Sequence, residues 1–289
     1  MKILITGANG FLASRIREYY KERHGIYGLT HADVDFTDAA GLQKVFTRIN
    51  PEIVIHCGAI SDIGACKRNP DASWYSNVYG TGTVADACNQ VDAKLIFCSS
   101  DQVYGYRSPE QAHKENEDLN PLNIYGEQKL SAERLATGRN LDTVCLRLSW
   151  MYDTRQRIGE HGNLITQLVD RLEAGQPFRY AANDYRSITN VSDIVKAMER
   201  VCQLPAGIYN IGSSNTLSTY DVVKRFLLPY DKASKLLLPD DESFAGGRNL
   251  RMDTSNIEQY GIRMNDTITS LESIRSEFEE LCRQKNIEL

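Results

Sequence analysis

The opening stretch of the chain restricts its possible folds more than any other. Residues 2–6 (K-I-L-I-T) are apolar and β-prone, and they lead directly into Gly7 and Gly10. The segment after this turn carries apolar side chains at helical spacing: Phe11, Leu12, Ile16 and Tyr19. A strand, a tight glycine turn and a helix together aim backbone N–H groups and the positive end of the helix at a phosphate. The stretch therefore predicts a dinucleotide-binding turn, with Ala13 at the third small position.

The turn begins a regular alternation of strands and helices through the first half of the chain. Strands are predicted at 2–6, 25–30, 52–56, 94–98 and 143–147, and later helices at 38–50, 70–91 and 125–137. Strands that alternate with helices of this length form parallel sheets covered on both faces. The sequence therefore predicts an α/β fold, a Rossmann-type doubly wound parallel sheet.

The second half is less regular and is expected to form a smaller C-terminal α/β lobe. Helices are predicted at 163–173, 192–202 with Ser192 as N-cap, 218–228 and 267–284, strands at 178–180 and 207–211, and loops over 229–247. We expect this lobe to cap the carboxyl ends of the strands, where ligands bind in such sheets. Residues 1–149, rejoined by about 187–211, are assigned to the dinucleotide-binding domain, and 150–186 with 212–289 to the lobe.

Composition and charge narrow the function classes. The net charge of -5 over 289 residues argues against a nucleic-acid-binding surface. No apolar run approaches the ~20 residues that span a bilayer, and residue 2 already begins a strand, unlike a signal peptide. The seven cysteines lack CxxC spacing and the five histidines lack paired spacing. We therefore expect a cytoplasmic protein without a metal, a membrane or a nucleic-acid partner.

Two segments carry side chains suited to proton transfer. Ser100 directly follows the strand predicted at 94–98, and Tyr125 and Lys129 share one face of the next helix because they are four residues apart. A tyrosine with its ordinary pKa near 10 exchanges protons poorly at neutral pH. A neighbouring ammonium favours the phenolate, and lowering the pKa by about three units takes roughly 4 kcal/mol. Tyr220 and Lys224 repeat the spacing in a later helix, so the pair is informative only together with Ser100.

Taken in order, these motifs resemble the extended short-chain dehydrogenases/reductases. The resemblance is closest to the dTDP-4-dehydrorhamnose reductases within the sugar-nucleotide group of reductases and epimerases. The matching motifs cover most of the chain: T-G-A-N-G-F-L-A at 6–13, N-V-Y-G-T at 77–81, N-P-L-N-I-Y-G-E-Q-K-L at 120–130, R-L-S-W at 147–150, and R-N with M-D-T between 248 and 254.

The resemblance implies hydride transfer between a nicotinamide cofactor and a nucleotide-linked sugar. In the catalytic set, Tyr125 would be the general acid, Lys129 would hold the nicotinamide ribose, and Ser100 would polarise the sugar C4 oxygen. The cofactor-binding residues would be Gly7, Asn9, Gly10, Phe11, Leu12, Asp35, Phe36, Cys57, Gly58, Ala59, Asn77, Ser99, Tyr125 and Lys129. The substrate-binding residues would be Ser100, Asp101, Gln102, Trp150, Asn163, Arg186 and Arg248.

The reaction most consistent with these residues is NAD(P)H-dependent reduction of a nucleotide-linked 4-keto-6-deoxysugar. A dehydratase is disfavoured because Gln102 stands where such enzymes carry a glutamate, and an amide cannot abstract a proton. An epimerase that retains NAD is an alternative, because residues 184–193 resemble epimerases equally well. A second alternative is a catalytically silent cofactor-binding regulatory subunit like that of methionine adenosyltransferase, which the intact Ser100, Tyr125 and Lys129 argue against.

The cofactor and the sugar are less narrowly defined. Thr30 and His31 stand where NAD-specific proteins carry an acidic residue for the ribose 2′-hydroxyl, which favours NADPH or dual use. Gly246, Gly247 and Leu250 depart from the reductase pattern where the nucleotide sugar is expected, so its base and sugar stay open. A homodimer also stays open.

Overall fold

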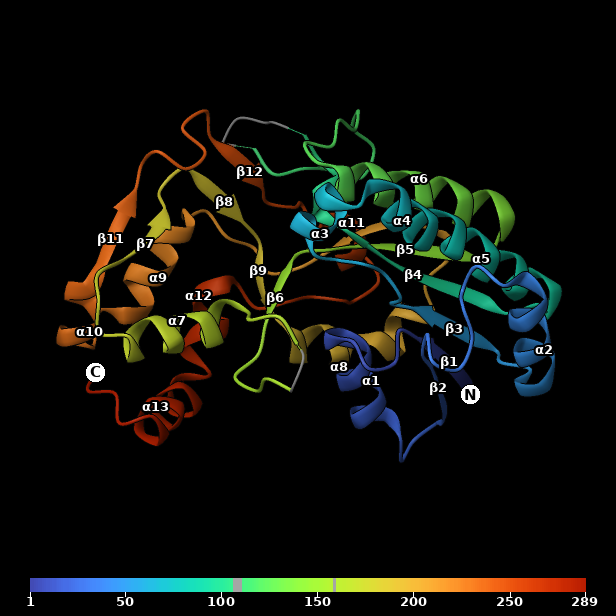
Figure 1. Ribbon diagram of the computed structural model, residues 1–289, viewed down its shortest axis with the longest axis horizontal. Helices are drawn as coiled ribbons and strands as arrows, with labels where there is room; N and C mark the ends of the chain where they lie inside the picture. The colour runs from blue at the N-terminus through green and yellow to red at the C-terminus, as the bar shows by residue number, and fades with distance from the viewer. Residues whose placement is uncertain (106–110, 158–159) are drawn as a thin grey trace.

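Six parallel strands form the central sheet of the computed structural model, which describes residues 1–105, 111–157 and 160–289 (Figure 1). They are β1 (Lys2–Thr6), β2 (Gly25–Leu29), β3 (Ile53–His56), β4 (Lys94–Ser100), β5 (Thr143–Leu148) and β10 (Gly207–Ile211). Their order in the sheet is β10-β5-β4-β3-β1-β2. The chain leaves β1 toward β2 and returns to pair β3 on the other side, so a topological switch point lies at β1. The predicted α/β, doubly wound parallel sheet is confirmed.

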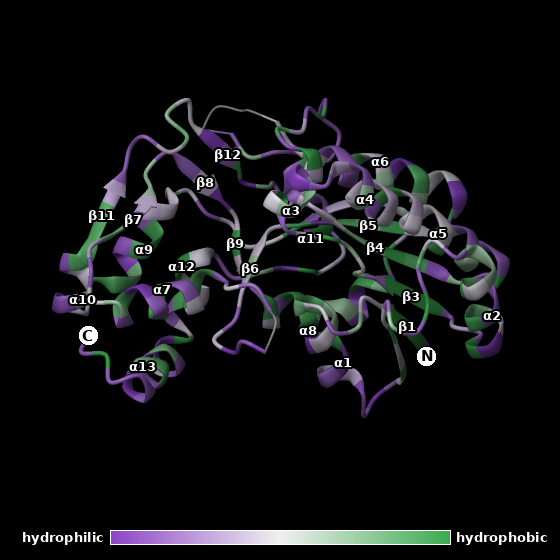
Figure 2. Ribbon diagram, in the orientation of Figure 1, coloured by the Kyte–Doolittle hydropathy of each residue, from purple (hydrophilic) through white to green (hydrophobic). Residues whose placement is uncertain are grey.

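Helices cover both faces of this sheet. Its strands are apolar, as Figure 2 shows, so both faces must be shielded from water. One face is covered by α1 (Phe11–Tyr20) and α8 (Val191–Val201). The other is covered by α2 (Ala39–Ile49), α5 (Gly80–Gln90) and α6 (Ile124–Arg139). Strands β3 and β5 are buried at every residue, and β1 at all but its first.

The helix predicted over 70–91 is a composite. It consists of α4 (Pro70–Trp74), a π-helical turn η1 (Tyr75–Tyr79) and α5, and is preceded by α3 (Ile63–Arg68), which was not predicted. The wider π turn coincides with buried Asn77, whose side chain contacts the loop after β3. Such turns are frequent at functional sites.

The second lobe has its own apolar core and lies at the left of Figure 1. Its helices are α7 (Leu164–Glu173), α9 (Thr219–Leu227), α10 (Asp231–Leu236), α12 (Thr267–Glu272) and α13 (Arg275–Gln284), and α11 (Ser255–Glu258) packs near β10. This half of the chain also forms three two-stranded sheets. They are β6 (Trp150–Tyr152) with β9 (Ile188–Asn190), β7 (Phe178–Ala181) with β11 (Leu237–Asp240), and β8 (Asp184–Arg186) with β12 (Arg248–Leu250). The domain boundaries drawn from the sequence stay a prediction.

Three local predictions in this half were wrong. The N-cap of α8 is Asn190, which accepts a hydrogen bond from the Ser192 N–H, so Ser192 already lies inside the helix. The helix predicted over 267–284 is broken at Ser273 and Ile274. The loop predicted over 229–247 contains α10 and β11, because pairing with β7 imposes strand geometry that local sequence does not favour.

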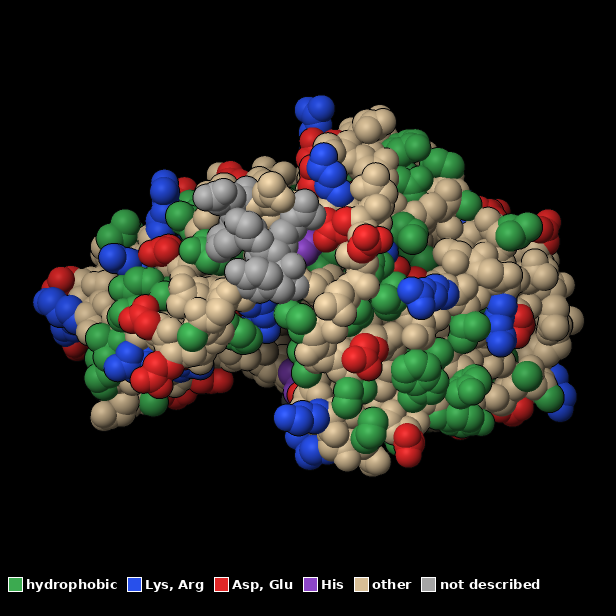
Figure 3. Space-filling view, turned by 90° about the horizontal axis from the view of Figure 1, so that it is seen from above, with side chains coloured by type: hydrophobic (Ala, Val, Ile, Leu, Met, Phe, Trp, Pro, Cys, Tyr) green, Lys and Arg blue, Asp and Glu red, His purple; other side chains and the backbone are tan. Residues whose placement is uncertain are grey.

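The face above α4 and η1 exposes aromatic side chains. Trp74, Tyr75 and Tyr79 are 38%, 55% and 52% exposed, and Figure 3 shows hydrophobic side chains gathered on this side of the molecule. Among the described residues, no helix has the length and apolar character needed to cross a bilayer. The homodimer left open by the sequence stays untested.

Candidate active site

The glycine turn between β1 and α1 has the geometry of a phosphate cradle. Gly7 adopts φ +65°, and a Cβ there would lie 2.7 Å from the Gly58 backbone, so only glycine fits. The Gly10 N–H donates to the Gly7 carbonyl at 2.8 Å and closes the turn. Gly10 is the N-cap of α1 without any side-chain cap, and the first helical turn carries no acidic residue. The uncapped N–H groups and positive helix end therefore fit the diphosphate of a dinucleotide.

The residues expected beside the adenine support the turn. The Phe36 ring is 2% exposed and lies so close to Gly58 that a Cβ at Gly58 would be 2.5 Å from Phe36 Cε2. The Asp35 carboxylate accepts hydrogen bonds from the Thr37 N–H and hydroxyl, which lower the pKa of Asp35. Gly58 therefore lies between the Gly7 backbone and the Phe36 ring, and no larger residue fits at position 58.

Two predicted cofactor residues have their side chains occupied by protein partners. Asn77 accepts from the Ile60 N–H at 2.7 Å and donates to the Ile60 carbonyl and to Gln128 Oε1, so it holds the loop after β3 against α6. The Ser99 hydroxyl donates to Glu133 at 2.5 Å. Both side chains are buried, so we assign them to positioning the site. Spacing along the chain does not reveal the contact between Asn77 and Gln128.

The three predicted catalytic side chains meet at the carboxyl ends of the sheet strands. Ser100 ends β4, and Tyr125 and Lys129 lie one turn apart on α6. The Ser100 hydroxyl, which donates to Asp101 Oδ1, lies close enough to Tyr125 to favour its phenolate. Lys129 Nζ donates to the Cys98 carbonyl at 2.8 Å and lies 5.8 Å from the centre of the Tyr125 ring. All three are buried, which removes competing water from their interactions.

The charge state of Tyr125 differs from the expectation. Burial raises the pKa of Tyr125, the nearby Asp101 carboxylate raises it further, and the neighbouring Ser100 hydroxyl only partly opposes this. Burial also lowers the pKa of Lys129. We expected Lys129 to lower the pKa of Tyr125, and for the protein alone this expectation was wrong. Desolvation of the phenolate outweighs the attraction of the ammonium.

Asp101 lies at the centre of the cluster with one oxygen free of protein partners. Its Oδ1 accepts from Ser100 and from Gln102 Nε2, both at 3.1 Å, whereas buried Oδ2 has no hydrogen-bond partner. Burial raises the pKa of Asp101, and the positive charges of Arg186 and Arg248 oppose that rise. An unpartnered buried oxygen beside Ser100 and Tyr125 fits contact with a ligand hydroxyl or water.

The two arginines expected at the substrate converge on Asp184. Arg248 binds the Asp184 carboxylate with Nε and Nη2 at 2.7 and 2.9 Å, and Arg186 Nε lies 3.4 Å from it. The Arg186 guanidinium also lies 5.2 Å from the Trp150 ring centre. We call Arg186 and Arg248 the positive wall, because their charges act on the Asp101 carboxyl.

Asn163 is mainly a structural residue. Its side-chain oxygen caps α7 by accepting from the Ile165 and Thr166 N–H groups, within a capping box. Its buried Nδ2 has no partner. Only that nitrogen is available for the substrate contact predicted from the sequence.

The structure adds a positioning contact between the Ser100 loop and α6. Asn123 caps α6 by accepting from the Gly126 N–H and donates its amide to Gln102 Oε1 at 2.9 Å. A Cβ on Gly126 would lie 2.0 Å from the Gln102 carbonyl oxygen. Spacing alone showed neither contact, although an Asn before a helix is a recognisable cap signal.

Replacing Gly126 with alanine is expected to displace Tyr125 from Ser100. Overpacking of this kind costs about 1–3 kcal/mol, and a shift near 1 Å at a catalytic group can reduce the rate about 100-fold. Urea unfolding and steady-state kinetics would measure both effects. Gly138→Ala in the same helix is the matched control, because nothing lies within 4 Å of its Cβ position. Equal kinetics for the two variants would contradict the proposed contact.

A buried histidine beneath the cradle predicts sensitivity to acid. His56 lies between the Thr6 and Thr81 hydroxyls at 2.6 and 3.0 Å, and burial lowers its pKa to about 3. The unfolded chain binds a proton on this histidine below about pH 6.5 while the folded protein does not, so stability is retained above that pH. Between pH 6.5 and about 3, the free energy of unfolding should fall by up to about 1.4 kcal/mol per pH unit from this group.

Urea unfolding at pH 7 and pH 5 measures this dependence. His56→Gln should reduce the difference between the two pH values, whereas exposed His161→Gln should leave it unchanged. An unchanged difference in His56→Gln would contradict the assignment.

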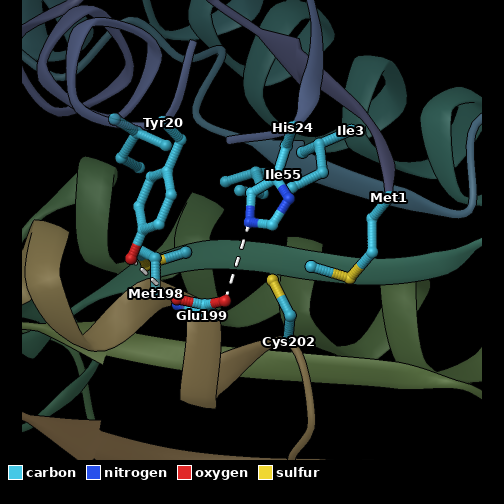
Figure 4. Close-up of a pocket in the computed structure, with 9 residues that line it drawn as sticks. Met1, Ile3, Tyr20, His24, Ile55, Met198, Glu199 and Cys202 are labelled. Atoms are coloured by element: carbon cyan, nitrogen blue, oxygen red, sulfur yellow. Dashed lines mark hydrogen bonds and ion pairs between the residues drawn. The ribbon is translucent and has the colours of Figure 1, made fainter. Parts of the chain in front are cut away.

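A small pocket lies at the opposite end of the strands from the Ser100–Tyr125–Lys129 cluster. Figure 4 shows Met1, Tyr20, His24, Met198 and Cys202 around it, between β1, α1 and α8. It lies at the amino end of β1, whereas ligands of doubly wound sheets bind at the carboxyl ends. The candidate active site is therefore the cradle with the Ser100–Tyr125–Lys129 cluster.

Comparison with known proteins agrees with this geometry. Residues 1–284 match the family described as RmlD substrate binding domain. SpsK, a spore coat polysaccharide biosynthesis protein of Bacillus subtilis, is 24% identical over 91% of this chain and 92% of its own length. A dTDP-4-dehydrorhamnose reductase of Mycolicibacterium smegmatis is 27% identical over 76% of this chain and 66% of its own, and bovine methionine adenosyltransferase 2 subunit beta is 25% identical over 90% and 83%.

Solved structures share the fold. A dTDP-4-dehydrorhamnose reductase of Bacillus anthracis in complex with NADP superposes with a TM-score of 0.84 at 24% identity, covering 95% of this chain and 98% of that one. A UDP-glucose 4-epimerase of Thermus thermophilus in complex with NAD gives 0.77 at 20% identity, covering 95% and 99%. The chain thus belongs to the RmlD substrate binding domain family, among the extended short-chain dehydrogenases/reductases with the dTDP-4-dehydrorhamnose reductases.

Proposed function

We propose that this protein reduces the 4-keto group of a nucleotide-linked 6-deoxysugar with NADPH or NADH. The observation that carries the proposal is the buried Ser100–Tyr125–Lys129 cluster beside an uncapped helix N-terminus. Family membership and relatives named dTDP-4-dehydrorhamnose reductase support it. The positive wall of Arg186 and Arg248 suits the diphosphate of a nucleotide sugar.

Each side chain has a defined part in this reaction. When bound, the nicotinamide cofactor supplies the hydride that reaches the carbonyl carbon. Tyr125 donates its hydroxyl proton to the carbonyl oxygen, and the raised pKa keeps that proton in place through neutral pH. Ser100 donates a hydrogen bond to the same oxygen as negative charge develops there. Lys129, fixed on the Cys98 carbonyl, presents its remaining N–H groups to the cofactor ribose.

Absorbance of the reduced cofactor tests the proposal. Enzyme, NADPH and dTDP-4-keto-6-deoxymannose are mixed, with GDP- and UDP-linked 4-keto sugars in parallel reactions. We expect cofactor oxidation with one of them that depends on Tyr125. Rates no higher than those of Tyr125→Phe for all three nucleotides would overturn the proposal.

Two alternatives give different results in the same experiments. An epimerase would purify with bound NAD and isomerise its sugar without net cofactor oxidation, as the likeness to a UDP-glucose 4-epimerase structure allows. A regulatory subunit would be catalytically silent and bind a stable protein partner. The relatives named methionine adenosyltransferase 2 subunit beta motivate that test. The buried Ser100, Tyr125 and Lys129 favour catalysis over a catalytically silent subunit.

A further inference from the structure

Two cysteine thiols meet directly beneath the proposed active site. Cys57 follows β3 and Cys98 lies in the neighbouring strand β4. Their sulfur atoms are 3.5 Å apart. Across the described residues, which include every cysteine of the chain, no other two cysteine sulfurs make such a contact. The pair is therefore distinct from the other five cysteines.

The backbone around the pair is suited to a disulfide. The strands pair in register His56 to Phe97, so the next residues along each strand, Cys57 and Cys98, are neighbours. Adjacent strands lie about 4.8 Å apart, within the Cα separation of about 4.4–6.8 Å that disulfides span. A bond of about 2.05 Å requires the two sulfurs to approach by roughly 1.5 Å, which needs only side-chain rotation and a small shift.

The surroundings of the pair make one thiol more reactive than the other. The contact with Cys57 and the positive charge of Lys129 lower the pKa of Cys98, and burial opposes them. The same contact and burial raise the pKa of Cys57. Cys98 therefore ionises more readily than Cys57, which is the arrangement of an attacking and a resolving cysteine.

We propose that Cys57 and Cys98 are a redox modification site that forms a reversible disulfide with a hydroperoxide as oxidant. Cys98 loses its proton, the resulting thiolate attacks the peroxide, the O–O bond breaks to leave a sulfenic acid, and the departing hydroxide takes up that proton as water. Cys57 sulfur then attacks Cys98 sulfur, the S–O bond breaks, and the released hydroxide takes the Cys57 proton as water. Two thiols and one hydrogen peroxide thus give one disulfide and two waters. Cys57 is half-buried and is the more accessible of the two thiols.

The position of the pair connects its oxidation to cofactor binding. Cys57 precedes Gly58, whose backbone contacts Gly7 of the cradle. The Cys98 carbonyl holds Lys129. Drawing the two sulfurs together moves both attachments, so we expect the disulfide to reduce NADPH affinity and activity. This consequence rests on the proposed function, whereas formation of the disulfide does not.

The test uses the full chain, reduced and then treated with hydrogen peroxide. Peptide mapping without reductant should show Cys57 linked to Cys98, with two hydrogen atoms lost per chain. NADPH affinity, followed by cofactor fluorescence, should fall and return with dithiothreitol. The reduction rate should fall by up to about 100-fold, since displacement near 1 Å costs rates of that order. Cys98→Ser and Cys57→Ser should each lose the peroxide response relative to their own untreated samples. Cys88→Ser, a buried cysteine on the other face of the sheet, should keep it.

The outcomes separate the two proposals. Peroxide treatment that leaves Cys57 and Cys98 unlinked, or links them without any change in NADPH affinity, overturns the inference. A peroxide response that persists in Cys98→Ser also overturns it. A linked pair with reduced NADPH affinity, in a protein that reduces no 4-keto sugar, supports the redox site and refutes only the proposed substrate reaction.

Discussion

Replacing Tyr125 with phenylalanine is expected to lower kcat by about 10²- to 10⁴-fold while NADPH still binds. General acids contribute on this scale, and phenylalanine keeps the buried ring while removing the proton that the carbonyl oxygen would receive. Tyr125 is a buried residue of α6, and phenylalanine fills the same space with the same ring. The fold should therefore tolerate this substitution. Steady-state kinetics with the responsive nucleotide sugar and cofactor fluorescence measure the two properties separately.

The chain contains a matched control for this substitution. Tyr220 and Lys224 on α9 repeat the spacing, and Lys224 Nζ lies 5.6 Å from the Tyr220 ring centre, close to the 5.8 Å of Lys129 and Tyr125. Tyr220→Phe should leave kcat within about twofold of the unmodified protein, as surface substitutions away from a site usually do. Comparable losses in both variants would show that the tyrosine at 125 is not the proton donor.

Replacing Arg147 with methionine is expected to destabilise the protein by about 3–5 kcal/mol. Arg147 and Glu133 are 1% and 3% exposed and form two hydrogen bonds, at 3.0 and 2.8 Å. Removing the arginine leaves the Glu133 carboxylate buried without its cation, which is the costly step. The arginine also donates to Tyr104, so that contact is lost too. Urea unfolding at pH 7 measures the change.

Two variants show whether the cost comes from the stranded charge. A double variant with Glu133→Leu and Arg147→Met should recover much of the lost stability, since apolar pairs of similar volume often replace buried ion pairs without cost. Arg139→Met breaks the exposed pair with Asp86, which is 2.6 Å long, and should cost less than about 1 kcal/mol. A double variant less stable than Arg147→Met would contradict this account.

The fold was predictable because its signals are local. Glycine at position 7, continuous apolar strands and helices of ten or more residues each follow from backbone sterics and burial of nearby residues. The predicted boundaries of helices and strands were wrong where distant contacts, and not neighbouring residues, set the structure. The strand β11 forms because β7 lies beside it, and the break at Ser273 in the last predicted helix has no glycine or proline to announce it.

The sequence by itself determined the sheet, the glycine cradle and the chain order of Ser100, Tyr125 and Lys129. Only the tertiary structure decided their chemical state, because burial, unlike spacing, sets the cost of a charge. It raised the pKa of Tyr125 where helix spacing suggested a decrease, and it left Asp101 Oδ2 unpartnered. It also brought the sulfurs of Cys57 and Cys98, which are 41 positions apart in the chain, to 3.5 Å. Contacts between strands depend on the register of the sheet, which no single segment encodes.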